Sequence, residues 1–152
     1  MKPFEKFGFK GVISSNKMDT LNVTNKDNLI SFVMNLSPSN ETRTHWIACY
    51  IDKNDSVEYY DSYGKHPNEE FMKNIKSLIE KLKPEVYLKF KINKIIQQRS
   101  NSKNCGFFVI RFIIDRLSGI PFKECTGYSD VVNSEKNISK FKKKLQEKFQ
   151  FI

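Results

Sequence analysis

Cysteine and histidine are scarce in this chain. Three cysteines, Cys49, Cys105 and Cys125, lie far apart without any C-x-x-C pair, and only two histidines are present. A disulfide framework or a zinc knuckle needs closely spaced sets of such residues, so neither is indicated. No carboxylate and histidine cluster has metal-ligand spacing, and no glycine-rich phosphate loop follows a predicted strand. We therefore predict neither a metal site nor a phosphate-binding loop.

Long hydrophobic runs are also missing. No segment approaches the roughly 20 apolar residues of a membrane span, and the N-terminal residues contain no apolar core of a signal peptide. We expect a soluble protein that is not secreted by a signal peptide and has no membrane partner. The hydrophobic fraction of 39%, with 13% aromatic residues, indicates a folded globule. A length of 152 residues suits a single domain, spanning 1–152.

Negative charge is under-represented, because 17 acidic residues stand against 26 lysines and arginines, which gives a net charge of +9. A polyanion partner such as nucleic acid is one explanation of this excess. Composition is the other, since lysine greatly outnumbers arginine and both asparagine and isoleucine are abundant, as in proteins of AT-rich genomes. No RNP, zinc-finger or helix-turn-helix signature is visible. Nucleic-acid binding through the lysine-rich surface is therefore the weaker interpretation.

Two neighbouring segments are predicted to form a β-hairpin. Trp46–Ile51 is apolar enough for a strand buried on both faces, Val57–Tyr60 follows as a second strand, and residues 52–56 form the turn. Antiparallel strands joined by a short turn bring their outer ends side by side. His45 and Asp61 stand at those outer ends, so we expect an imidazole next to a carboxylate.

Other elements follow from hydrophobic patterning. Ile30–Leu36 is predicted to be a strand, and Ser14–Asn28 is expected to be irregular. Apolar residues alternate with polar ones at Leu88, Phe90 and Ile92, which predicts a half-buried strand. An amphipathic helix is predicted from Pro67 to a stop at Lys83-Pro84, and a second one along the C-terminal segment. Their apolar stripes are Phe71, Ile75, Leu78, Ile79 and Leu82, and Ile138, Phe141, Leu145, Phe149 and Ile152.

The most apolar run of the chain follows Cys105. Nearly every residue from Gly106 to Leu117 is apolar, and a helix that is apolar around most of its circumference belongs in the middle of a domain. Cys105 would begin this helix, where unpaired N–H groups and the helix dipole favour a thiolate. Cys49 is expected to be a small core residue, and Cys125 an ordinary free thiol in a loop.

A thiol, an imidazole and a carboxylate are the side chains that nucleophilic acyl transfer uses. In chain order these groups and a glutamine stand in four motifs: His45-Trp46, Tyr60-Asp61-Ser62-Tyr63-Gly64, Gln98 and Asn104-Cys105-Gly106-Phe107-Phe108. The motifs and their order resemble the adenovirus-type (adenain-like) maturation proteases and the related proteases that process ubiquitin-like modifiers. The resemblance extends from about Ser31 to about Leu117. Within this superfamily, the chain looks most like capsid-maturation proteases of virophages and Maverick/polinton-type elements.

The resemblance implies a fold and a set of catalytic roles. The fold is α+β and of the permuted papain-like cysteine protease type, with a mixed or antiparallel sheet packed on a central buried helix that carries the nucleophile. Cys105 would be the nucleophile and His45 its imidazole partner. Asp61 would hold that imidazole in the useful tautomer, and Asp52, at the hairpin turn, is a weaker competitor for this role.

Two further residues are candidates for the site. Gln98 would donate a side-chain N–H to the oxyanion, together with the Cys105 backbone N–H, and Gln97 is its competitor. Trp46 would line or shield the substrate site, although an aromatic residue in an apolar strand is equally well explained as plain core.

Three functions are compatible with these motifs. The first is a viral maturation cysteine endopeptidase that cleaves capsid or other virion precursors after small residues such as glycine, in the virion and in the cytoplasm or virus factory of the infected cell. The second is a protease that processes or removes ubiquitin-like modifiers. The third, a binding module on an inactive scaffold, is disfavoured by the intact Cys105, His45 and Asp61. We expect a monomer that needs no cofactor, and leave activation by DNA or a viral peptide as an alternative.

Overall fold

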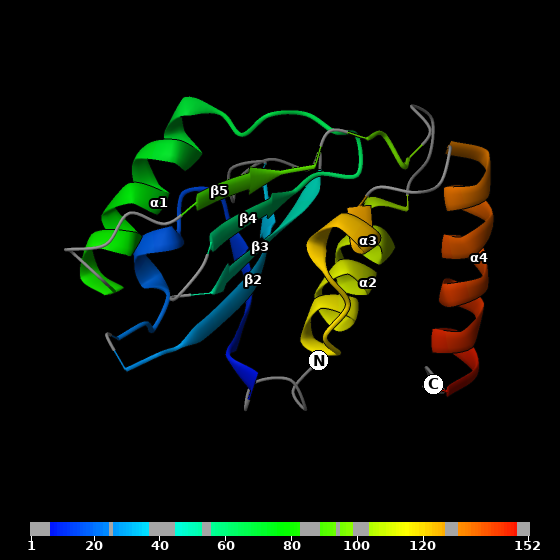
Figure 1. Cartoon of the computed structure of the whole chain (residues 1–152), viewed down its shortest axis with the longest axis horizontal. Helices are drawn as coiled ribbons and strands as arrows, with labels where there is room; N and C mark the ends of the chain where they lie inside the picture. Colours follow the sequence, from blue (N-terminus) through cyan, green and yellow to red (C-terminus); the bar gives the residue numbers. More distant parts are fainter. Residues whose placement is uncertain are drawn as a thin grey trace.

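The computed structural model describes residues 7–24, 26–36, 45–52, 56–82, 89–93, 95–98, 104–126 and 131–148 (Figure 1). Several expectations fall outside these ranges: the middle of the hairpin turn, the helix stop at Lys83-Pro84, the first residue of the Leu88 strand, and the stripe positions Phe149 and Ile152.

Five strands form one mixed sheet in the order β1-β2-β3-β4-β5. Their bounds are Phe9–Ser14 (β1), Leu29–Asn35 (β2), Trp46–Asp52 (β3), Ser56–Tyr60 (β4) and Lys89–Ile92 (β5). The three central strands are antiparallel, and each outer strand pairs in parallel with its neighbour. This mixed sheet is the one that the predicted α+β fold requires.

Helices cover both faces of the sheet (Figure 1). Their bounds are Met18–Thr20 (the 3-10 turn η2), Glu69–Leu82 (α1), Cys105–Leu117 (α2), Phe122–Thr126 (α3) and Val131–Lys148 (α4). Helix α1 packs on one face, whereas α2 packs on the other face against β3 and also contacts α4. Helix α2 therefore occupies the central position that its apolar circumference predicts.

Alternate residues of the strands build a hydrophobic core on each face. The core under α1 includes Phe32, Cys49, Tyr59, Phe71 and Ile75. The core under α2 includes Val33, Ala48, Tyr60, Phe112 and Ile138. Because β3 contributes to both cores, its five central residues are all buried, as the apolar run predicts. Ile138 is fully buried, so the apolar stripe of α4 docks that helix on the domain.

The register of the β3–β4 hairpin brings its outer ends together. Ala48 pairs with Tyr60 and Cys49 pairs with Tyr59. His45 directly precedes β3 and Asp61 directly follows β4, so both lie at the same end of the hairpin. The sequence expectation for this pair of residues is confirmed.

Strand β1 has no counterpart among the predicted elements. Its Val12 is 58% exposed, and Gly11 interrupts the strand, so the alternation that predicts a half-buried strand is absent. Gly8, just before β1, has φ +91°, and a Cβ there would collide with the Leu29 carbonyl oxygen. Only glycine lets the chain approach β2 this closely. The stretch that follows β1 is largely irregular, as expected, although η2 buries Met18.

Cys125 lies in a short helix, so the prediction of a loop at this position is wrong. Its N–H donates to the Pro121 carbonyl oxygen at 3.0 Å and thereby closes the turn of α3. Burial raises the pKa of the Cys125 thiol to about 12. Cys49 is fully buried, as predicted, and burial raises the pKa of its thiol well above the usual value. Neither thiol is therefore ionised at neutral pH.

Candidate active site

His45 and Asp61 form a hydrogen-bonded pair at the end of the hairpin. The distance from His45 Nε2 to Asp61 Oδ1 is 2.9 Å. Asp61 is 1% exposed, whereas the imidazole is 25% exposed at its side chain. With Nε2 on the carboxylate, Nδ1 is the ring nitrogen left for the Cys105 thiol, which also acts on the pKa of the imidazole. The structure thus places His45 between an acid and a thiol.

The turn after β4 fixes the Asp61 carboxylate. Oδ1 also accepts a hydrogen bond from the Tyr63 backbone N–H at 2.8 Å. The Gly64 N–H closes the turn by donating to the Asp61 carbonyl oxygen at 2.8 Å, and Gly64 adopts φ +68°, a left-handed conformation that glycine reaches without strain. The Tyr63 ring then packs against the His45 imidazole with centroids 4.9 Å apart. The Asp-Ser-Tyr-Gly motif is therefore both a turn and a support for the imidazole.

Cys105 is the first residue of α2, at the position predicted for the nucleophile. Its thiol contacts the His45 imidazole and accepts hydrogen bonds from the backbone N–H groups of Trp46 and Gly106. The side chain of Asn104, the residue before the helix, does not cap it but donates to Glu135 of α4 at 3.2 Å. The Gly106 N–H, in the first turn of α2, is thus one of the groups that favour a thiolate at Cys105.

These contacts shift both pKa values in the directions that favour an ion pair. Burial alone would lower the pKa of His45, but hydrogen bonds to Asp61 and Cys105 outweigh it and raise the pKa from 6.5 to about 9. Burial would raise the pKa of the Cys105 thiol, but the hydrogen bonds from His45 and the backbone bring it below its usual value of 9.0. Both shifts favour a thiolate next to an imidazolium.

A cleft of about 770 Å³ opens beside the thiol. It is lined by Leu36, His45, Trp46, Tyr59, Asp61, Tyr63, Lys65, His66, Asn68, Cys105, Gly106 and Phe107. Trp46 forms part of this wall, and its Cδ1 lies 4.0 Å from the point that a Cβ on Gly106 would occupy. From the sequence, Trp46 could be either a cleft-lining residue or a core residue. The structure places it at the cleft.

Gln97 and Gln98 share one anchor but point to different places. Both backbone N–H groups donate to the Ser62 carbonyl oxygen, at 2.8 Å and 3.0 Å. The Gln98 side-chain oxygen accepts a hydrogen bond from Ser62 Oγ at 2.5 Å, which keeps Gln98 next to the Asp61-Ser62 turn. The Gln97 side chain instead accepts from the Tyr60 hydroxyl and donates to the Cys125 carbonyl oxygen at 3.1 Å.

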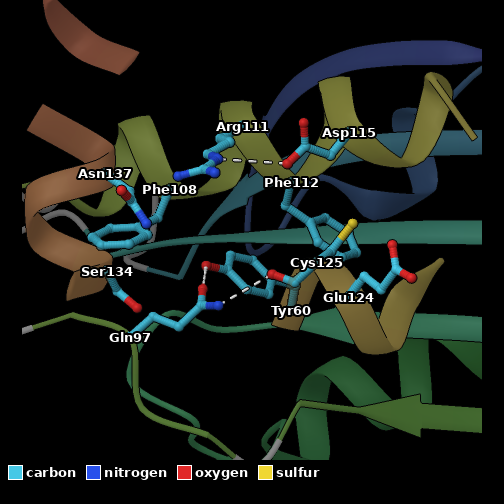
Figure 2. A pocket seen from close by; sticks show the side chains of 10 residues that line it. All are labelled: Tyr60, Gln97, Phe108, Arg111, Phe112, Asp115, Glu124, Cys125, Ser134 and Asn137. Carbon is cyan, nitrogen blue, oxygen red and sulfur yellow. Dashed lines mark hydrogen bonds and ion pairs between the residues drawn. The ribbon is translucent and has the colours of Figure 1, made fainter. Parts of the chain in front are cut away.

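Figure 2 shows the position of the Gln97 side chain. It lies in a separate small cavity of about 80 Å³ between α2, α3 and α4, together with Tyr60 and Cys125. Gln97 is thus directed away from the cleft, whereas Gln98 lies beside the turn that carries Asp61, and its role as an oxyanion donor stays a prediction. Asp52, the competitor for Asp61, pairs with Ser56 at the other end of the hairpin and is remote from His45.

Two residues of this region have no role in the sequence prediction. Tyr63 supports the imidazole, and Asn93, directly after β5, hydrogen-bonds to the main chain of Asp61. The Asp-Ser-Tyr-Gly motif contains Tyr63, so its proximity to the site could have been inferred. Asn93 carries no such signal, because it lies 32 residues from Asp61 in the sequence.

The described residues hold neither a metal-binding group of side chains nor a helix suited to span a membrane. Within those ranges, no group of three or more histidine, cysteine, aspartate or glutamate side chains is arranged to bind a metal ion. In the same part of the chain, none of the helices combines the length and apolar content needed to cross a membrane.

A thiol at the start of a buried helix, facing a histidine and an aspartate at one end of a sheet, is the arrangement of the papain-like cysteine proteases in their permuted form. Comparison with known families agrees with this class. The chain belongs to the Ulp1 protease family, whose C-terminal catalytic domain matches residues 5–150. The predicted membership of the superfamily that joins adenain-like and ubiquitin-like-modifier proteases is confirmed.

Individual proteins are similar to the chain in sequence or in fold. A protein of Acanthamoeba polyphaga mimivirus that carries the name thiol protease is 32% identical over 127 residues, which make up 76% of this chain and 42% of the relative. Two crystal structures of the ASFV pS273R protease are similar, with TM-scores of 0.61 (16% identity, 91% of this chain and 61% of that one) and 0.57 (24% identity, 70% and 41%).

A structure of the SUMO protease Ulp1 is similar as well, with a TM-score of 0.51 and 17% identity over 82% of this chain and 56% of that one. These structural likenesses establish the fold. The chain spans 42% of the length of the mimivirus relative and 41% to 61% of the ASFV protease chains.

Proposed function

We propose that the chain is a cysteine endopeptidase in which Cys105, His45 and Asp61 hydrolyse a peptide bond. The observation that supports it most directly is the 2.9 Å contact between His45 Nε2 and Asp61 Oδ1, next to the thiol at the start of α2. Acyl transfer requires a nucleophile, a base within hydrogen-bond reach and a third group that orients the base. All three line one cleft.

The first half of the reaction forms an acyl-enzyme. The Cys105 thiolate attacks the scissile carbonyl carbon, and the carbonyl π electrons move to the oxygen. The Gln98 side-chain N–H and the Cys105 backbone N–H donate to this oxyanion. When the intermediate collapses, the C–N bond breaks, and the His45 imidazolium gives its proton to the leaving amine.

The second half releases the product. His45, now neutral, takes a proton from a water molecule, and the resulting hydroxide attacks the thioester carbon. The C–S bond breaks, so that the acyl group leaves as a carboxylic acid and the Cys105 thiolate and His45 imidazolium are restored. Asp61 keeps Nε2 protonated throughout and therefore leaves Nδ1 free to exchange the proton.

Viral precursor proteins, such as capsid precursors, are the substrate class that we favour. The support comes from the similarity to proteases of a mimivirus and of ASFV. Cleavage after a small residue such as glycine is part of this proposal, and Trp46 and Phe107, which line the cleft with Cys105, are the side chains that would limit the size of the residue bound there. The enzyme would then act in the virion and in the cytoplasm or virus factory of the infected cell, as a monomer without a cofactor.

Processing of ubiquitin-like modifiers is the second candidate. The likeness to the SUMO protease Ulp1 favours it.

One experiment separates the two candidates. The purified chain is incubated with the capsid precursor encoded by the same genome and, in parallel, with a fusion protein that joins a ubiquitin-like modifier to a reporter through a Gly-Gly sequence. Mass spectrometry locates any cut, and Cys105→Ala serves as the matched control. Cleavage of the precursor alone supports a maturation protease, and cleavage of the fusion alone supports the modifier protease. Cleavage of neither by a folded wild-type chain contradicts the endopeptidase proposal.

A further inference from the structure

The Asn93 side chain forms two hydrogen bonds with the main chain of Asp61. Its Oδ1 accepts a hydrogen bond from the Asp61 backbone N–H at 2.9 Å, and its Nδ2 donates to the Asp61 carbonyl oxygen at 2.5 Å. Asn93 is 2% exposed, so these bonds form away from competing water. Its own backbone N–H points to the Tyr59 carbonyl oxygen at 3.4 Å. A single buried amide thus saturates both main-chain polar groups of Asp61.

Asn93 lies where the pairing of β4 with β5 ends. The parallel pairing of β4 with β5 ends at Tyr59 and Ile92, one residue before Asn93 and two residues before Asp61. Among the described residues, the strand pairing of β4 reaches Tyr60 and does not include Asp61. The Asn93 side chain continues the pattern of the sheet with its own N–H and C=O groups, because an amide presents one donor and one acceptor side by side.

We propose that Asn93 is a positioning residue that fixes the Asp61 backbone, and with it the direction of the carboxylate toward His45. The carboxylate reaches the imidazole through only two side-chain torsions, so a backbone shift at Asp61 moves Oδ1 away from Nε2. Misplacement of a catalytic group by about 1 Å is enough to lower a rate about 100-fold. This inference depends on the proposed function, because it assumes that Asp61 orients His45.

The environment of His45 makes the effect measurable. The groups in the described residues that act directly on its charge are Asp61 and Cys105. The Tyr63 ring packs on the imidazole, and Tyr59, Lys65 and His66 line the same cleft. None of the other groups replaces Asp61 as an anionic partner. A displaced Asp61 carboxylate should therefore lower the pKa of His45. The ionised fraction of the Cys105 thiol should fall as a result.

The test replaces Asn93 with leucine, which has a similar size but neither a donor nor an acceptor. Thr126→Val is the control, because Thr126 is also buried and its side chain also bonds to the main chain, with one hydrogen bond from Oγ1 to the Phe122 carbonyl oxygen at 2.7 Å in α3, against the two that Asn93 makes. Both variants and the wild type are compared for melting temperature, for the pH dependence of kcat/KM, and for the rate at which iodoacetamide alkylates Cys105. Peptide mapping separates Cys105 from Cys49 and Cys125.

Asn93→Leu should lower kcat/KM about 10- to 100-fold, move the alkaline limb of the pH profile to lower pH, and slow alkylation of Cys105 at pH 7 by about threefold or more. Thr126→Val should leave the pH profile and the alkylation rate unchanged. A purely structural role of Asn93 predicts a lower melting temperature with both profiles as in the wild type, and that result would overturn the proposal.

The experiment remains decisive if Asn93→Leu does not fold or if the wild type cuts no peptide. If Asn93→Leu does not fold, Asn93→Ser takes its place, because a hydroxyl at this position is too short to span both groups of Asp61, and the same shifts are expected. Alkylation requires no protein substrate. A wild-type chain that alkylates readily at Cys105 but cuts no peptide would therefore refute the endopeptidase function, while the alkylation profiles would still decide the role of Asn93.

Discussion

Glu58 and Arg116 form a two-point ion pair between β4 and α2. Arg116 Nε and Nη2 donate to Glu58 Oε1 and Oε2, each at 2.8 Å, and Glu58 is completely buried. The guanidinium also lies over the Tyr50 ring, 4.3 Å from its centroid. Strand β4 leads directly to Asp61, and α2 begins with Cys105. The pair therefore ties the element that carries the acid to the helix that carries the thiol.

Replacing Arg116 with methionine should lower the free energy of unfolding by about 3–5 kcal/mol, because Glu58 would be left buried without a charged partner. Chemical denaturation measures this change. Arg111→Met is the matched control, because Arg111 pairs with Asp115 on a more exposed part of the same helix, at 3.5 Å, and should change stability by less than about 1 kcal/mol. Equal losses in the two variants would contradict a special role for the Glu58–Arg116 pair.

The pH dependence of kcat/KM should show an active range that ends at high pH. Activity needs both the Cys105 thiolate and the His45 imidazolium. The raised pKa of His45 keeps the imidazolium up to about pH 9, and the lowered pKa of Cys105 favours the thiolate below the ordinary value of 9.0. Activity should therefore fall as the pH rises through about 9, where His45 loses its proton.

Asp61→Asn tests the cause of that alkaline limb. An amide removes the anionic partner that raises the pKa of His45, so the limb should move to lower pH, and activity at neutral pH should fall. An unchanged pH profile in Asp61→Asn would show that another group holds the imidazole.

Gln98→Ala should lower kcat about 100- to 1,000-fold, because removal of one oxyanion donor has an effect of this size in acyl-transfer enzymes. KM should change little, since the oxyanion is absent from the bound ground state. Gln97→Ala is the matched control. Its side chain joins Tyr60 and Cys125 outside the cleft, so its loss should act mainly on stability. A larger loss of kcat in Gln97→Ala than in Gln98→Ala would reverse the assignment.

The lysine-rich surface leads to a separate prediction about DNA. If it binds a polyanion, added double-stranded DNA should raise the cleavage rate at low salt, and the gain should vanish as the salt concentration increases. Lys143 and Lys144 are exposed on α4 and are the first residues to replace with glutamine in a variant. A cleavage rate that DNA leaves unchanged at every salt concentration would assign the positive charge to composition alone.

The sequence was sufficient for the parts of the site that local patterning controls. The apolar segments around His45 and Asp61 predict a hairpin, and pairing of Ala48 with Tyr60 delivers the two side chains to the same end. The apolar helix after Cys105 predicts a central position, and the structure places it between the sheet and α4.

Contacts between segments far apart in the sequence could not be predicted in the same way. Asn93 and Asp61 meet because β4 and β5 pair in parallel. No sequence pattern around either residue predicts this contact. The choice between Gln97 and Gln98 depends on which side of the chain faces Ser62 and which faces Tyr60. Strand β1 escaped prediction because Gly11 and the exposed Val12 break its alternation.

Hydrolysis by purified Cys105→Ala tests the central claim most directly. Wild type and variant are compared for circular dichroism, melting temperature and cleavage of the substrate identified for the wild type. We expect Cys105→Ala to keep a native-like spectrum and a cooperative melting transition but to show no detectable cleavage. Cleavage by Cys105→Ala at a rate close to that of the wild type would show that the nucleophile lies elsewhere.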